Sequence, residues 1–250
     1  MENRLVIITP FYNPGEFLEK CVASLMSQRY DNFKVIFVDD CSTDDSFEKL
    51  PKDDERATII KNETRKTALE NIHFVIMNHC KPEDIICLLD GDDFLPNKKV
   101  LSHINEFYNE HDCWVSWGSS IWINDPHGRT CFSSPYTEEE FKNIRTAPYR
   151  ISHLRTFRAG LYLNGIKSQD PEFKCLKDAN GKFYTSCYDA AIFIPLLELS
   201  PFLKCKHDTE KNYCYVLHSQ NDHVVDQRKQ TRIHQEVLKK LPFKKIENYL

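Results

Sequence analysis

Short apolar segments alternate with amphipathic ones along roughly the first 110 residues, and this alternation is the strongest constraint on the fold. The apolar segments are rich in β-branched residues and predict strands at 5–9, 33–38, 57–60 and 85–89. Apolar residues recur at helical spacing between them, which predicts helices at 16–28, 65–80 and 97–108 and a short helix through Leu50. Strands that are apolar on both faces must be covered on both faces, so we expect a doubly wound α/β domain with a mainly parallel sheet.

The pattern changes after Asp112. The remainder predicts strands at 114–123 and 213–217, helices at 152–163 and 189–199, and a polar C-terminal helix at 222–241. No flexible polar stretch separates the two parts. We therefore expect one domain, 1–250, made of two halves, 1–112 and 113–250.

Composition excludes several classes of protein. Thirty-three Lys and Arg against 37 Asp and Glu give a net charge of −4, which lacks the basic footprint of a nucleic-acid-binding protein. Nowhere do 18 apolar residues run together, and the N-terminus carries no export signal, so we expect a cytoplasmic protein without a membrane span. The ten cysteines form no Cys-x-x-Cys pair and are interpreted as reduced thiols rather than zinc ligands.

Two clusters of carboxylates follow predicted strands. Residues 90–93 (Asp-Gly-Asp-Asp) come after the strand at 85–89, and Asp39 and Asp40 end another strand. Parallel strands bind ligands beyond their carboxyl ends, so both clusters should face one crevice. Carboxylates there suit a divalent cation that bridges the phosphates of a substrate. The alternative is a solvated loop of acids that caps the next helix.

The first strand is followed by residues 10–13 (Pro-Phe-Tyr-Asn). Neither Gly-x-Gly-x-x-Gly nor Gly-x-x-x-x-Gly-Lys stands there, which argues against dinucleotide-binding proteins and P-loop NTPases. A metal ion is the obvious group to neutralise the phosphates instead.

Three segments, taken together, resemble the signatures of family-2 inverting glycosyltransferases of the GT-A fold. They are 7–13 (Ile-Ile-Thr-Pro-Phe-Tyr-Asn), 38–46 (Val-Asp-Asp-Cys-Ser-Thr-Asp-Asp-Ser) and 89–93 (Leu-Asp-Gly-Asp-Asp), in the family's order and spacing. One departure is Cys41, where the family usually has Gly or Asn. This residue should perturb the turn without removing a ligand.

The resemblance implies a binding site for a nucleotide-sugar, in which Tyr12 lines the base and Asp40 accepts a hydrogen bond from a uracil N–H. Helix capping is the alternative role of Asp40. Asp92 would ligate Mn²⁺ or Mg²⁺, and His218 is the first choice for a further metal ligand, ahead of His223. The full set implied at the nucleotide is Pro10, Phe11, Tyr12, Asp40, Arg65, Asp90 and Gly91, with Asp93 supporting the metal site.

Relatives carry a general base at the start of a helix in the second half, which here implies Asp189. The family often has Glu-Asp at this point, and Tyr188 replaces the Glu. Asp178, in a predicted tight turn, is the rival, and helix capping is the alternative role of Asp189. Four basic residues could meet the diphosphate or an acidic acceptor, or form a solvated face: Arg150, His153, Arg155 and Arg158.

The expected function is metal-dependent transfer of a sugar from a nucleotide-sugar, with UDP favoured, to a hydroxyl group with inversion. The acceptor could be a glycan, a protein or a small molecule. A degenerate nucleotide- or glycan-binding protein and a sugar-nucleotide pyrophosphorylase are the alternatives. The sequence leaves the sugar, the acceptor and the oligomeric state open.

Overall fold

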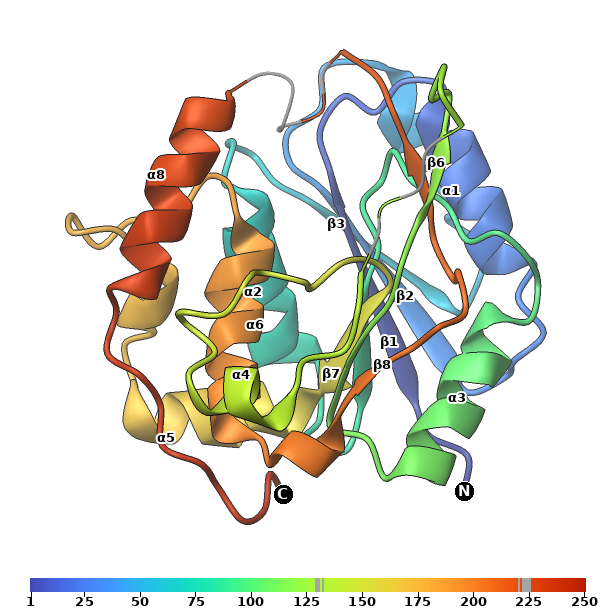
Figure 1. Cartoon of the computed structure of the whole chain (residues 1–250). Coiled ribbons are helices and arrows are strands. Elements are labelled where there is room, and N and C mark those ends of the chain that lie inside the picture. The colour runs from blue at the N-terminus through green and yellow to red at the C-terminus, as the bar shows by residue number, and fades with distance from the viewer. Residues whose placement is uncertain (129–130, 132, 220, 222–225) are drawn as a thin grey trace.

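A computed structural model of the chain describes residues 1–128, 131, 133–219, 221 and 226–250. Within these residues a seven-stranded sheet has the order β3-β2-β1-β4-β7-β5-β8, beside a two-stranded sheet of β6 and β9 (Figure 1). The large sheet contains β1 (Leu5–Phe11), β2 (Phe33–Asp39), β3 (Ala57–Lys61), β4 (Ile85–Leu88), β5 (Val115–Trp117), β7 (Arg155–Arg158) and β8 (Cys205–His207). The small sheet contains β6 (Ile121–Ile123) and β9 (Cys214–Val216).

Helices cover both faces of the large sheet, as the apolar strands require. The α-helices are α1 (Phe17–Met26), α2 (Ala68–His79), α3 (Val100–His111), α4 (Glu138–Lys142), α5 (Lys167–Gln169), α6 (Tyr188–Leu199) and α8 (Gln227–Leu238). Tighter or wider turns of helix occupy Asp45–Lys49, Leu161–Ile166, Lys174–Leu176 and Phe202–Lys204. Successive residues of β1 alternate between the cores: Val6 and Ile8 pack on the side of α2 and α6, whereas Leu5 and Ile7 pack on the side of α1 and α3.

The predicted α/β fold is confirmed as a single domain with a mainly parallel sheet. In the described part of the chain, β7 is the strand of the large sheet that runs against the others, between β4 and β5. The prediction of a helix at 152–163 is therefore wrong at its centre, where residues 155–158 form β7. Four residues are too few for a period to distinguish helix from strand, and pairing with two neighbouring strands decides the conformation.

Other strand and helix boundaries also differ from the predicted ones. The strand predicted at 114–123 divides into β5 and β6, which belong to different sheets. β1 continues through Pro10 instead of stopping there. The Pro10 carbonyl faces the β4 side and accepts from the Gly91 N–H. An N–H at residue 10 would face the same side, beyond the last residue of β4, so the sheet tolerates a proline there. The first residues predicted for the C-terminal helix, 222–225, lie outside the described residues.

A largely buried ion pair fastens the C-terminal segment to the domain. The Arg145 guanidinium donates to the Glu198 carboxylate of α6 at 2.6 and 2.9 Å, and to the carbonyls of Val237 and Leu241. Glu198 also accepts from the Phe243 N–H at 3.0 Å. α8 and the segment after it are therefore held to α6 by groups that water cannot readily replace.

We expect Arg145→Ala to lower the melting temperature by about 6–12 °C, because removing one partner of a buried pair costs about 3 kcal/mol. Lys142→Ala is the matched control, since Lys142 pairs with Glu139 while both side chains are more than half exposed. Its melting temperature should stay within about 2 °C of the parent. Thermal unfolding followed by circular dichroism makes the comparison, and equal losses in both variants would contradict this role for Arg145.

Candidate functional site

The acidic loop after β4 lies against the end of β1. The Gly91 N–H donates to the Pro10 carbonyl at 3.4 Å, and a Cβ placed on Gly91 would lie 2.5 Å from the Cβ of Phe11. A side chain at this position would collide with β1, so glycine is needed for the close approach. The approach brings Asp90 and Asp92 to the carboxyl end of β1, as the strand-end argument predicted.

Asp90 contacts the start of α6. The Tyr188 hydroxyl lies 2.8 Å from both carboxylate oxygens of Asp90 and donates to them. The next residue, Asp189, accepts from the guanidinium of Arg155 at 3.1 Å. Arg155 is buried on β7, whereas the Asp189 side chain is 22% exposed. Asp189, predicted to be the base, and Asp90, predicted to bind the nucleotide, are therefore connected through the first turn of α6.

Asp92 meets His218, which follows β9. Their Oδ2 and Nε2 atoms are 2.8 Å apart, and the His218 ring stacks on Phe17 with ring centres 5.0 Å apart. Asp92 also borders a cavity of about 280 Å³. The other residues that line the cavity are Glu16, Phe17, Lys20, Phe94, Ile123, Asn124 and Val216.

Asp93 points into the protein instead. Its carboxylate accepts from the Tyr213 hydroxyl at 2.6 Å and from the Val216 N–H at 2.7 Å. Burial, together with the neighbouring Asp92 and Asp90 charges, raises the pKa of Asp93 well above its usual range. Asp93 thus fastens β9 to the acidic loop.

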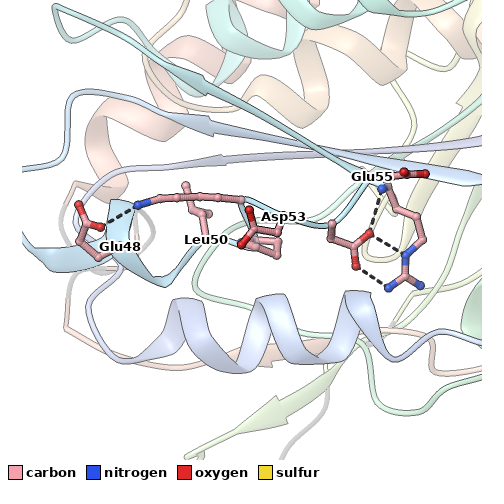
Figure 2. Close-up of a pocket in the computed structure, with 8 residues that line it drawn as sticks. Glu48, Leu50, Asp53 and Glu55 are labelled. Atoms are coloured by element: carbon pink, nitrogen blue, oxygen red, sulfur yellow. Dashed lines mark hydrogen bonds and ion pairs between the residues drawn. The ribbon is translucent and has the colours of Figure 1, made fainter.

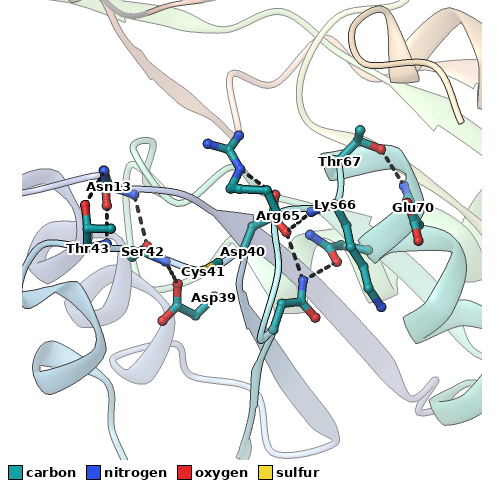
Figure 3. A network of polar contacts seen from close by, with 12 residues as sticks. Asn13, Asp39, Asp40, Cys41, Ser42, Thr43, Arg65, Lys66, Thr67 and Glu70 are labelled. Atoms are coloured by element: carbon teal, nitrogen blue, oxygen red, sulfur yellow. Dashed lines mark hydrogen bonds and ion pairs between the residues drawn. The ribbon is translucent and has the colours of Figure 1, made fainter.

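Asp40 is the centre of a polar network at the end of β2 (Figure 3). It is buried and accepts from the Asn62 amide at 2.9 Å, from the Lys66 N–H at 2.8 Å and from the Arg65 Nε at 3.2 Å. Arg65 in turn covers the ring of Tyr12, 3.4 Å from its centre. The residues predicted to bind the nucleotide base therefore lie together, ordered by an interaction that orients Arg65.

The alternative role of Asp40 as a helix cap does not describe its contacts. Asp44 caps the helix at 45–49 by accepting from the Ser46 N–H at 3.1 Å, and Asp39 accepts from the Ser42 N–H at 2.7 Å. Between them, Cys41 has φ +67°, in the left-handed region that favours Gly or Asn. This explains why a cysteine is unusual at this turn.

Several other sequence-predicted residues have structural partners. Asp178 accepts from the N–H groups of Asn180 and Lys182 within its own exposed turn, which lowers its pKa. The four basic residues do not converge: Arg150 forms a bidentate pair with Glu140, and Arg158 bonds to Asn3 and to the Glu83 carbonyl. His153 stacks on Tyr213 and Tyr215, and Arg155 holds Asp189. His223 lies outside the described residues.

A second, larger hollow of about 800 Å³ lies on the surface beside the helix at 45–49 (Figure 2). One continuous segment, Glu48 with 50–56, supplies its lining, including the ion pairs Lys52–Glu48 and Arg56–Asp54. It shares no lining residue with the acidic loop and is therefore separate from the candidate site.

Sequence reasoning missed two partners of the acidic loop, Tyr188 and Tyr213. Tyr188 stands where the family often has a glutamate, and its position beside Asp189 is the available signal. Nothing in the sequence pattern singles out Tyr213. The sequence pattern groups Arg155 with its basic neighbours and so does not predict its pairing with Asp189.

The acidic loop offers a carboxylate to a metal ion beside the His218 imidazole. Over the described residues, no group of three or more His, Cys, Asp and Glu side chains is arranged to hold one. The Asp92 and His218 atoms nevertheless have the spacing of adjacent ligands, because two ligands at about 2.1 Å in octahedral geometry lie about 3 Å apart. Carboxylate and imidazole also suit Mn²⁺. Asp92 and His218 therefore fit two adjacent positions in the coordination shell of such an ion.

Solved structures with a similar fold are glycosyltransferases. The TarS 1–349 fragment of Staphylococcus aureus in complex with UDP superimposes with a TM-score of 0.62 at 17% identity, covering 94% of this chain and 64% of that one. The mannosyltransferase PcManGT of Pyrobaculum calidifontis, in complex with GDP-Man and Mn²⁺, gives a TM-score of 0.55 at 15% identity, covering 94% of this chain and 61% of that one. The fold is thus of the GT-A glycosyltransferase class.

The chain belongs to glycosyl transferase family 2, whose sequence model matches residues 6–163. Glycosyltransferase GlyG of Streptococcus pneumoniae serotype 4 is 28% identical over 135 residues, covering 53% of this chain and 44% of GlyG. The match therefore spans less than half of that relative. No helix in the described part of the chain is both long and apolar enough to cross a bilayer.

Tyr188→Phe should weaken UDP binding in the presence of Mn²⁺ by about five- to tenfold, because the variant removes a hydrogen bond that orients Asp90. Calorimetry measures the affinity. Tyr184→Phe is the matched control, since the buried Tyr184 hydroxyl has no hydrogen-bond partner among the described residues. UDP affinity that is the same in both variants would contradict the role assigned to Tyr188.

Proposed function

We propose that this protein transfers a sugar from a nucleotide-sugar donor, preferably a UDP-sugar, to a hydroxyl acceptor with inversion of the anomeric configuration. The observation that carries the proposal is the meeting of four acids at one edge of the sheet: Asp40, Asp90, Asp92 and Asp189. In this assignment residues 1–112 bind the donor, and residues 113–250 supply the base and the acceptor site.

The preference for UDP rests on Asp40 and its surroundings. A carboxylate can accept from the N3–H of uracil, and a carboxylate has about four acceptor positions, of which the network fills part. Tyr12, 41% exposed, offers an aromatic surface beside it. Guanine could also satisfy a carboxylate, so selectivity must come partly from the size of the pocket. The similar folds that bind UDP and GDP-Man support a nucleotide donor of either kind.

Asp92 and His218 are the residues assigned to Mn²⁺ or Mg²⁺. The bound ion would offset the charge of the diphosphate and stabilise it as the leaving group. The carboxylates of the loop and the phosphates carry charges of the same sign, so without a cation they repel each other. Metal and nucleotide should therefore bind with positive coupling.

Asp92→Asn tests this coupling. The parent should bind UDP more tightly when Mn²⁺ is present, and the variant should lose that gain because a neutral amide is a weak ligand for the ion. Calorimetric titration of UDP with and without Mn²⁺ gives both affinities. An equal gain from Mn²⁺ in parent and variant would contradict the assignment of Asp92.

Asp189 is assigned as the base that takes the proton of the acceptor hydroxyl. A single displacement with inversion needs this group on the face opposite to the leaving diphosphate. Arg155 holds one carboxylate oxygen, which fixes the orientation of Asp189 at the start of α6 while the side chain stays partly exposed. Orientation of the base by a buried cation supports this role.

Asp189→Asn should slow transfer by about 10²–10⁴-fold and spare UDP affinity, since the base does not contact the nucleotide. The amide keeps the shape of the side chain, and circular dichroism verifies that the variant is folded at the assay temperature. Asp178→Asn is the control and should transfer at close to the parental rate. Near-parental transfer by folded Asp189→Asn would mean that another group is the base.

A screen of nucleotide-sugars tests the proposed function as a whole. With Mn²⁺ present, release of UDP from one UDP-sugar should exceed release of nucleotide from the GDP-sugars. A degenerate binding protein would bind UDP without turnover of any donor. A pyrophosphorylase would instead consume the sugar-nucleotide only when pyrophosphate is added.

A further inference from the structure

The surface of α8 carries positive charge that the rest of the protein does not neutralise. Residues 226–240 contain five Lys and Arg against two acids, a formal charge of +3 in a chain whose net charge is −4. Arg228, Arg232 and Lys239 lie on one exposed stripe of the helix, at i, i+4 and i+11. Within the described residues, none of these three forms an ion pair with a carboxylate.

The first two turns of α8 lie beside the proposed base. The Cys187 thiol, two residues before Asp189, donates to the Gln230 carbonyl at 3.2 Å. The ring of His234 packs on Tyr149 with ring centres 5.3 Å apart, and burial with the nearby Asp189 charge raises the pKa of Tyr149. In Figure 1, α8 stands alongside α6 and away from α1 and α3. The stripe therefore flanks the acceptor side of the site.

We propose that Arg228, Arg232 and Lys239 bind a polyanionic acceptor chain, one that carries phosphate or carboxylate groups along its length, and guide it towards Asp189. The inference rests on the proposed function, whose acceptor it specifies. Charge complementarity carries it, because exposed cations without partners attract an anionic chain over about 10 Å at physiological salt.

An anionic membrane is the competing partner, and the packing of α8 disfavours it. Helices that bind at a membrane surface insert an apolar face into the lipid. The apolar residues of α8 instead pack on the core beside α6: Ile233 and Val237 are buried and Leu238 is partly buried. The exposed residues of the helix are all polar or charged.

The test compares the parent with two triple variants in their binding of fluorescein-labelled inorganic polyphosphate, which is measured by fluorescence anisotropy at low ionic strength. The triple variant Arg228→Gln, Arg232→Gln, Lys239→Gln should bind about tenfold more weakly than the parent, since an exposed charge contributes a factor of about two to five. The control neutralises the same number of exposed cations beside the start of α3, as Arg29→Gln, Lys98→Gln, Lys99→Gln. It should stay within about twofold of the parent, and labelled neutral dextran should bind to none of the proteins.

Three results would overturn the inference: no polyphosphate binding by the parent, equal losses in the two triple variants, or no loss in the α8 variant. Binding of phosphatidylglycerol vesicles that depends on α8, without binding of polyphosphate, would favour the membrane instead. UDP affinity with Mn²⁺ is measured in parallel on the parent. If the parent does not bind UDP, this result would count against the proposed donor site, independently of the polyphosphate comparison.

Discussion

Repulsion among the carboxylates after β4 is the constraint on which the second half of the structure depends. Asp90, Asp92 and Asp93 lie within four residues, and burial, together with the charges of Asp92 and Asp90, raises the pKa of Asp93. Each acid has a partner from far along the chain: the Tyr188 hydroxyl, the His218 ring and the Tyr213 hydroxyl. These contacts hold α6, β9 and the loop after β9 around the acidic loop.

The part of the site proposed to bind the nucleotide is organised by a different interaction. Asp40 holds Arg65 and the backbone N–H of Lys66, just before α2, and Arg65 covers one face of Tyr12. In the proposed function, a nucleotide base would therefore reach the Tyr12 ring by its other face or by displacing Arg65. Arg65 thus contacts both the exposed ring of Tyr12 and the buried carboxylate of Asp40.

Features set by local sequence patterns could be predicted from the sequence, whereas features set by contacts between distant residues could not. The strands of the first half and the acids at their ends follow from local apolar patterns and from the geometry of parallel sheets. β7 could not be predicted in this way, because its four residues are placed by pairing with β4 and β5. Tyr188 and Tyr213 bond to acids 98 and 120 positions away, a separation at which no sequence period carries information. The pair of Asp92 and His218 is intermediate. The family resemblance implies His218 as a metal ligand, but its contact with Asp92 is tertiary and no local pattern predicts it.

A crystal structure of the protein with UDP and Mn²⁺ would locate the metal ion and the nucleotide together. We expect one ion bound to Asp92 and His218 at about 2.0–2.3 Å and shared with the diphosphate, with the uracil beside Tyr12 and Asp40. UDP bound through an ion that contacts neither Asp92 nor His218 would contradict it.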